Sequence, residues 1–391
     1  MTSTDREASG LAEAARALVP RVRALADETE RQRRLPAELV AAFARAGIFR
    51  MAVPRRFGGG EVAASILIAA LEELSRADGS AGWCAMIGAT SGVIAAYLPD
   101  ETANEIYARD PEVVTGGVFA PHGRALVVDE GYRISGRWPF ASGCQHCEWL
   151  MAGVVVVEDG KPRLLANGQP DSRLMFFPRS AATIVDTWNV SGLRGTGSHD
   201  LEITDLVVPR TRSVSIITEL PRERGPLYRF PVFGLLALGC AAVALGLARA
   251  AIDELVRLAT EKVPTGSRRR LAERGAIQVQ MAEAEALIGS ARAFLYESVG
   301  TAWDEAAAGG DISLARRARL RLAATHAVVT SARVVDLMYN AGGGTAIYAA
   351  SPLQRCFRDA HVVTQHIMVA PATLEVIGRL CFGLETDTAM L

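Results

Sequence analysis

The sequence has little net charge. Its 42 lysine and arginine residues nearly balance 43 aspartate and glutamate residues, which gives a formal net charge of −1. A protein that binds nucleic acid through phosphate contacts carries a clear excess of basic residues on one surface. The balance therefore argues against a nucleic-acid partner.

Cysteine is also scarce. The 391 residues include six cysteines, which are Cys84, Cys144, Cys147, Cys240, Cys356 and Cys381. Cys144 and Cys147 form a C-x-x-C pair, but a structural zinc site needs a second pair at a suitable spacing, and the sequence offers none. No disulfide framework is visible, and the polar start of the chain is unlike a signal peptide. We therefore expect a cytoplasmic protein without a metal centre.

Hydrophobic runs of membrane-spanning length are missing. The longest apolar run covers 232–248 and is rich in alanine and glycine. It falls short of the roughly 20 residues that a spanning helix needs. It continues into 249–258, which is amphipathic at helical spacing. This pattern predicts a buried helix of a bundle and no membrane partner.

A dinucleotide fingerprint is absent too. The sequence has no G-x-G-x-x-G motif placed between a predicted strand and a helix. In nicotinamide-binding folds these glycines let the backbone approach the pyrophosphate closely. We therefore expect no NAD(P)H site in this chain.

What the chain does contain falls into three parts. Residues 8–48, 64–77 and 81–97 have helical periodicity. Residues 112–212 are rich in Val, Ile, Thr and Gly, with glycine turns, and predict a β domain. Helices are then expected over 234–262, 269–307, 311–341 and 352–383. The organisation is α+β: an N-terminal helical domain (1–111), a middle β domain (112–218) and a C-terminal four-helix bundle (219–391).

The stretch 137–143 lies between two predicted strands. Trp138 and Phe140 can present a flat apolar wall there, and Ser142 adds one hydroxyl. Such a combination suits a planar ring with polar edges, such as a flavin isoalloxazine. Two core aromatics at a strand end would give the same residues, so on this stretch alone both interpretations stay open.

Four further motifs resemble the acyl-CoA dehydrogenase superfamily, in its order along the chain. They are the loop Pro54–Gly59, the helical segment Glu73–Trp83, the end of the β domain Trp188–Pro209, and Val243–Ile252 at the start of the bundle. The resemblance covers nearly the whole chain. It implies the acyl-CoA dehydrogenase-like fold.

The C-terminal segment indicates the branch. In a dehydrogenase a carboxylate base stands nine residues after the Arg of an Arg-Asp pair. Here the pair is Arg358-Asp359 and that position holds Ile367, which cannot take a proton, with His366 before it. Other branches place a glutamate on an earlier helix, where Glu254 or Glu261 could be considered. An Arg-Asp pair followed by His resembles the two-component flavin-dependent monooxygenases.

This resemblance implies a function. The chain would take reduced flavin, FMNH2 or FADH2, from a separate reductase and react it with O2 through a C4a-hydroperoxyflavin. It would then hydroxylate or otherwise oxygenate a small organic substrate, and it would assemble as a homotetramer. The alternatives are a dehydrogenase or oxidase acting on an acyl thioester, and a non-catalytic protein of the same fold.

The resemblance also assigns roles to residues. His366 would lie beside the C4a–N5 edge of the flavin and supply or hold a proton near neutral pH. Ser142 would accept a hydrogen bond from the flavin N5–H. The remaining flavin contacts would be Trp83, Trp138, Phe140, Thr196, Ser198, Arg268, Gly343 and Gly344.

For each of these residues a structural role is the alternative. Trp83, Trp138 and Phe140 would then be core aromatics, and His366 a hydrogen-bonded helix residue. Arg268 would be a solvated helix start instead of a phosphate ligand. Ser91 stands where phenol hydroxylases of this group tend to carry a substrate-binding histidine. The sequence therefore does not favour a simple phenol as substrate.

Overall fold

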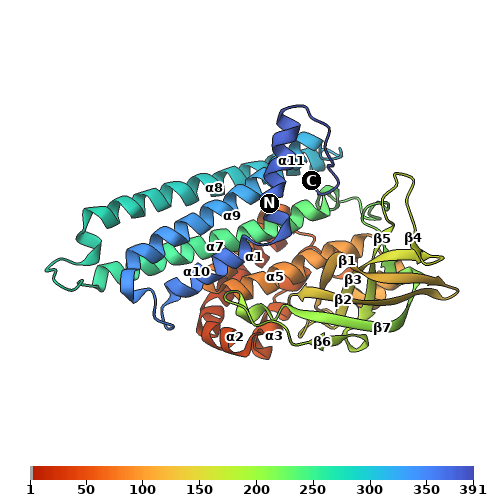
Figure 1. Cartoon of the computed structure of the whole chain (residues 1–391), viewed down its shortest axis with the longest axis horizontal. Coiled ribbons are helices and arrows are strands. Elements are labelled where there is room, and N and C mark those ends of the chain that lie inside the picture. Colours follow the sequence, from red (N-terminus) through yellow and green to blue (C-terminus); the bar gives the residue numbers. More distant parts are fainter. Residues whose placement is uncertain (1–2) are drawn as a thin grey trace.

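The computed structural model describes residues 3–391, with side chains from residue 10 onward. Helices run from the start of the described chain to Ala108, strands lie between Thr115 and Val214, and helices follow to Cys381. In Figure 1 the sheet lies at one end of the molecule and the long C-terminal helices extend away from it.

The N-terminal helices pack against the bundle. The main helices are α1 (Ser3–Ala24), α2 (Ala26–Gln32), α3 (Ala37–Arg45), α4 (Ala64–Ala77) and α5 (Gly79–Ser91). The shorter pieces include η1 (Ile48–Arg50), η3 (Gly92–Ala96) and α6 (Asp100–Ala103). The bounds predicted for α4 are confirmed. Asp78 begins α5, because its carboxylate accepts a hydrogen bond from the Ala81 N–H at 2.8 Å.

One sheet forms the middle of the chain. Its strands are β1 (Thr115–Val128), β2 (Gly131–Ala141), β3 (Trp149–Glu158), β4 (Lys161–Pro162), β5 (Ser172–Pro178), β6 (Thr183–Val185), β7 (His199–Pro209) and β8 (Ser213–Val214). They lie in the order β6-β7-β2-β1-β3-β5-β8, with β4 beside β3. β1 and β3 run parallel, and β2 pairs antiparallel with both β1 and β7. The end of β2 and the start of β7 are therefore neighbours.

The C-terminal helices surround a buried central helix. They are α7 (Val232–Glu261), α8 (Gly275–Ala307), α9 (Leu314–Gly342), α10 (Pro352–Val363) and α11 (Ala372–Cys381). Helix α7 contacts α4, α5, α9 and α10. By length and composition α7 and the segment Gly79–Ala96 could each cross a membrane, but most of both lies inside the fold. The apolar run of the sequence thus forms the centre of the helical core.

The prediction of one final helix over 352–383 is wrong. Helix α10 ends at Val363, a single 3₁₀ turn η11 spans Ile367–Val369, and α11 begins at Ala372. Pro371 disfavours a helical conformation in the residue before it, and Ala370 is extended with ψ of 156°. His366 therefore lies in a break between helices and not on a helix.

Candidate active site

Five side chains from distant segments meet where the three parts of the chain join. The Trp83 indole N–H donates to the Ser142 hydroxyl at 3.0 Å, and Ser142 lies 2.7 Å from the Ser198 hydroxyl. The Ser198 hydroxyl in turn lies 2.6 Å from that of Thr196. The His366 ring packs edge-on against Trp83, with ring centroids 5.3 Å apart. The structure thus brings together Trp83, Ser142, Thr196, Ser198 and His366.

A glycine-rich turn over 192–198 carries two of these hydroxyls. It needs a left-handed backbone at Leu193 and Gly197, with φ of 49° and 52°. A Cβ on Gly192 would lie 2.3 Å from the Arg358 carbonyl oxygen of α10, and a Cβ on Gly195 would meet Thr29 and Ser80. The turn therefore packs directly on helices from both ends of the chain.

His366 is held as a neutral imidazole. Burial, together with the positive charge of Arg321, lowers its pKa to about 4. Its Nδ1 accepts from the Met368 N–H at 3.3 Å and lies 3.5 Å from the Cys240 sulfur. Burial raises the pKa of Cys240 to about 12, so this sulfur keeps its proton and can donate. Both contacts make Nδ1 an acceptor, which leaves the imidazole proton on Nε2.

This changes the expectation for His366. A group with a pKa of about 4 carries no ionisable proton to give at neutral pH. The residue can still donate a hydrogen bond from Nε2–H, or pass that proton on while it receives another.

Trp138 and Phe140 do not form one wall. Trp138 is fully buried within the sheet, and its indole N–H donates to the Gly153 carbonyl at 2.6 Å. Phe140 is 69% exposed and touches Trp188. Residues two apart on a regular strand share a face, but Phe140 has φ of 65° and the β2–β7 register shifts between Trp138 and Ala141. Such a bulge turns the following side chain away from its expected direction.

Arg268, Gly343 and Gly344 lie elsewhere. All three are exposed, on the loops that follow α7 and α9. The two loops meet, since Lys262 Nζ donates to the Gly342 carbonyl at 2.8 Å. Figure 1 shows this end of the bundle opposite the sheet. Within one chain, these residues are not brought together with Ser142.

The alternative carboxylate bases do not join the cluster either. Glu254 pairs with Arg257 at 2.6 Å, and Glu261 lies in the last turn of α7 within 3.9 Å of the same arginine. Ile367, which stands where the dehydrogenase base is expected, is 70% exposed. Among the residues with described side chains, no group of three or more His, Cys, Asp or Glu could hold a metal ion.

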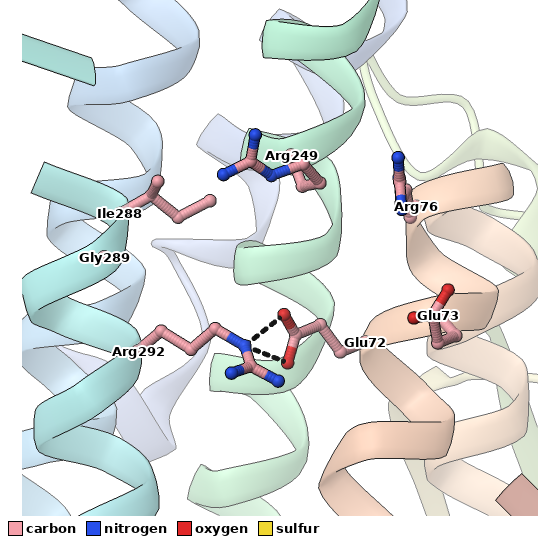
Figure 2. A pocket seen from close by; sticks show the side chains of 7 residues that line it. All are labelled: Glu72, Glu73, Arg76, Arg249, Ile288, Gly289 and Arg292. Carbon is pink, nitrogen blue, oxygen red and sulfur yellow. Dashed lines mark hydrogen bonds and ion pairs between the residues drawn. The ribbon is translucent and has the colours of Figure 1, made fainter. Parts of the chain in front are cut away.

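Two hollows lie outside the cluster. One of about 260 Å³ lies between α4, α7 and α8. Figure 2 shows Arg292 bonded to Glu72 across this hollow. The other two arginines that line it pair with carboxylates that do not: Arg76 with Asp253, and Arg249 with Glu285. The other, of about 720 Å³, lies between α3 and the segment 145–148 that follows Ser142. None of the five cluster side chains lines either hollow.

Two buried carboxyl groups, Asp78 and Asp359, lie near the glycine-rich turn, and sequence motifs did not indicate that the two interact. Asp359 of α10 accepts from the Leu193 N–H at 2.6 Å. Burial and the nearby Asp78 raise the pKa of Asp359 to about 7, and burial raises the pKa of Asp78 to about 6. In the sequence, Asp359 stood out only as part of the Arg-Asp pair. Its hydrogen-bond partner Leu193 is 166 residues away, so the motif could not reveal this contact.

These shifted pKa values predict a pH-dependent stability. Folded Asp359 keeps its proton up to about pH 7, whereas its ordinary pKa is 3.8. The folded state thus binds more protons than the unfolded state in this interval, so the unfolding free energy falls as pH rises through it. Asp359→Asn keeps an acceptor for Leu193 but cannot ionise, and should flatten that fall. Denaturant unfolding at pH 4 to 8 measures the unfolding free energy of each protein, and Asp311→Asn, at an exposed position, is the control. Equal slopes of this free energy against pH for Asp359→Asn and wild type would contradict the prediction.

The fold and this cluster define a class: an acyl-CoA dehydrogenase-like architecture whose carboxylate base is replaced, with hydroxyls and a neutral imidazole at the domain junction. Two family models match the chain: "Acyl-CoA dehydrogenase, N-terminal domain" over residues 5–106 and "Acyl-CoA dehydrogenase, C-terminal domain" over residues 238–371.

Individual proteins are similar over the full length. Indole-3-acetate monooxygenase of Pseudomonas putida is 39% identical, over 93% of this chain and 91% of that protein. The flavin-dependent monooxygenase oxygenase subunit HsaA of Mycobacterium tuberculosis is 32% identical over 100% of both chains. The structure of XiaF from a Streptomyces species in complex with FADH2 superposes with a TM-score of 0.89 at 26% identity, over 98% of this chain and 97% of that one.

The chain belongs to the acyl-CoA dehydrogenase superfamily, within the branch of two-component flavin-dependent monooxygenases. It is an oxygenase component, which uses reduced flavin from a separate reductase, and O2, to oxygenate a small organic substrate.

The residues present fit a flavin. Ser142 retains acceptor capacity beyond its two bonds, and the reduced ring carries an N–H at N5. Exposed Phe140, beside buried Trp188, offers an apolar surface to a planar group. When bound, a reduced flavin supplies the electrons that activate O2.

Proposed function

We propose that Ser142 and His366 flank the reactive edge of the reduced flavin in this oxygenase. The observation that supports this most is the contact of both residues with Trp83: its N–H binds Ser142 at 3.0 Å, and its ring packs against His366 at 5.3 Å. One indole thus sets the spacing between an acceptor hydroxyl and an imidazole that carries its proton on Nε2.

Each residue then has a defined task. Ser142 accepts the N5–H of the bound ring and keeps that proton in place. His366 directs its Nε2–H toward the reacting oxygen and so holds the proton that the oxygen needs. Trp83 of buried helix α5 contacts both side chains, and Cys240 of buried helix α7 contacts His366, so these helices limit the water that reaches the site.

The substrate in this proposal is an indole-type aromatic acid. It is supported by the 39% identity to an indole-3-acetate monooxygenase over nearly the whole chain. Ser91 agrees with this choice, because it is buried and lacks the imidazole that phenol hydroxylases of this group tend to use.

The proposal includes a homotetramer located in the cytoplasm. Arg268, Gly343 and Gly344 would then serve the flavin of another copy, because within one chain they lie at the far end of the bundle. Apolar residues on the same end support a contact there: Ile347 and Tyr348 are 67% and 68% exposed. Light scattering at micromolar concentration measures the assembly, and a stable monomer would contradict it.

The activity can be tested with the purified chain and chemically reduced FMN or FAD. After mixing with ¹⁸O₂ and indole-3-acetate, mass spectrometry should find one ¹⁸O atom in the product. NADH with oxidised flavin and no reductase should give no steady oxidation. Reduction of the bound flavin by an acyl-CoA, without oxygen transfer, would instead support the dehydrogenase alternative.

A further inference from the structure

Three hydroxyls form a continuous chain that ends on a backbone carbonyl. Thr196 Oγ1 lies 2.8 Å from the Leu193 carbonyl oxygen and 2.6 Å from Ser198 Oγ. Ser198 Oγ lies 2.7 Å from Ser142 Oγ, which also receives the Trp83 N–H. All three hydroxyl residues are buried, with exposed fractions of 5% or less.

The groups at the two ends of this row of hydroxyls determine the direction of each hydrogen bond in it. A carbonyl oxygen only accepts, so the single proton of Thr196 is directed to Leu193. Thr196 must then accept from Ser198, and Ser198 must accept from Ser142. The Ser142 proton is thereby committed to Ser198. At the other end the Trp83 indole N–H only donates, so it occupies one lone pair of Ser142 without changing this order.

We infer that Thr196 and Ser198 are positioning residues that fix Ser142 as a pure hydrogen-bond acceptor, and that this polarity makes the site select reduced over oxidised flavin. Reduced flavin carries a proton at N5 and can donate it to the free lone pair of Ser142. Oxidised flavin has only a lone pair at N5, which would face the lone pair of Ser142 without a proton between them. This inference rests on the placement of N5 at Ser142 proposed above.

Two substitutions free the Ser142 proton from its bond to Ser198 while leaving Ser142 itself in place. In Thr196→Val, the Ser198 proton loses its acceptor and can turn to Ser142, whose own proton then becomes free to face the flavin. The Leu193 carbonyl keeps a partner in that variant, because the Trp188 indole N–H also donates to it, at 3.0 Å. In Ser198→Ala, the Ser142 proton loses its acceptor directly. Both variants should therefore accept oxidised flavin better.

The experiment measures the dissociation constants of oxidised and reduced FMN and FAD, the latter anaerobically, for each protein without substrate. The ratio of oxidised to reduced dissociation constants should fall about tenfold in Thr196→Val and Ser198→Ala. For a two-electron couple this equals a drop of about 30 mV in the midpoint potential of the bound flavin. Thr325→Val, at a buried threonine of α9, is the matched control and should keep the wild-type ratio.

Ser142→Ala distinguishes the placement of the flavin at Ser142 from the fixed direction of the hydroxyl bonds. If it weakens reduced flavin while Thr196→Val and Ser198→Ala leave the ratio within twofold of wild type, the fixed polarity is overturned and the placement of the flavin stands. If Ser142→Ala changes neither affinity, the flavin edge does not lie at Ser142, and both the placement and this inference are wrong. A ratio that falls in Thr196→Val and Ser198→Ala, and in Ser142→Ala because reduced flavin loses its acceptor, but stays at the wild-type value in Thr325→Val supports the inference.

Discussion

Replacing His366 by alanine should slow the reaction of the reduced-flavin complex with O2 by ~10²–10⁴-fold, the range typical of proton-transfer assistance by a positioned side chain. Flavin affinity should change much less, since the imidazole packs against Trp83 and not against the serine–threonine chain. Stopped-flow absorbance after mixing the reduced complex with O2 measures this rate. Exposed His326→Ala on α9 is the control.

The pH dependence of that rate gives a second check on His366. Because burial holds its pKa near 4, the residue stays neutral across pH 5 to 8 and should produce no transition near the ordinary histidine pKa of 6.5. His366→Asn, which retains an N–H donor, should recover part of the rate lost in the alanine variant. If His366→Ala reacts with O2 at the wild-type rate and still oxygenates substrate, the role assigned to this imidazole is wrong.

Local signals predicted the parts of the fold that depend on neighbouring residues. The bounds of α4 follow from the apolar spacing within its own segment. The order of N-terminal helices, middle sheet and C-terminal bundle was also predicted from local signals, because each part has its own hydrophobic periodicity.

The errors arose where long-range geometry overrides that periodicity. Phe140 turns outward because the pairing of β2 with β7 shifts register at that point, which the residues of β2 alone do not reveal. The final helix was expected to be continuous because its composition is helical. Pro371 excludes a helical conformation only for Ala370, so this rule does not predict that α10 already ends at Val363, ahead of His366.

The composition of the site was partly predictable, and its connections were not. Motif resemblance selected Trp83, Ser142, Thr196, Ser198 and His366, which the structure brings together. It could not show that Cys240 and Met368 set the tautomer of His366, nor that the hydroxyls form a chain with one direction. The contacts of Cys240 with His366 and of Ser198 with Ser142 join residues far apart in sequence, and the bond from the Met368 N–H depends on the local path of the backbone, so no motif reveals them.

The contact between the glycine-rich turn 192–198 and α10 supports the three hydroxyls, and it should be highly sensitive to a methyl group added at Gly192. In Gly192→Ala the new Cβ would lie 2.3 Å from the Arg358 carbonyl oxygen and 2.8 Å from the Asp359 nitrogen. Backbone atoms of α10 cannot rotate away as a side chain would, so the glycine-rich turn must shift. That shift would also break the bond from Leu193 N–H to Asp359, leaving a buried carboxylate with fewer donors.

We expect Gly192→Ala to lower the unfolding free energy by about 2–5 kcal/mol, combining overpacking with a lost buried hydrogen bond. Reduced flavin should also bind more weakly, because Thr196 and Ser198 move with the turn. Gly300→Ala is the matched control, since its Cβ meets nothing within 4 Å on α8 and should stabilise the helix by roughly 0.5–1 kcal/mol. Denaturant unfolding and flavin titration measure both effects. A Gly192→Ala protein as stable as wild type, with unchanged flavin affinity, would mean that the contact of this turn with α10 does not position the site.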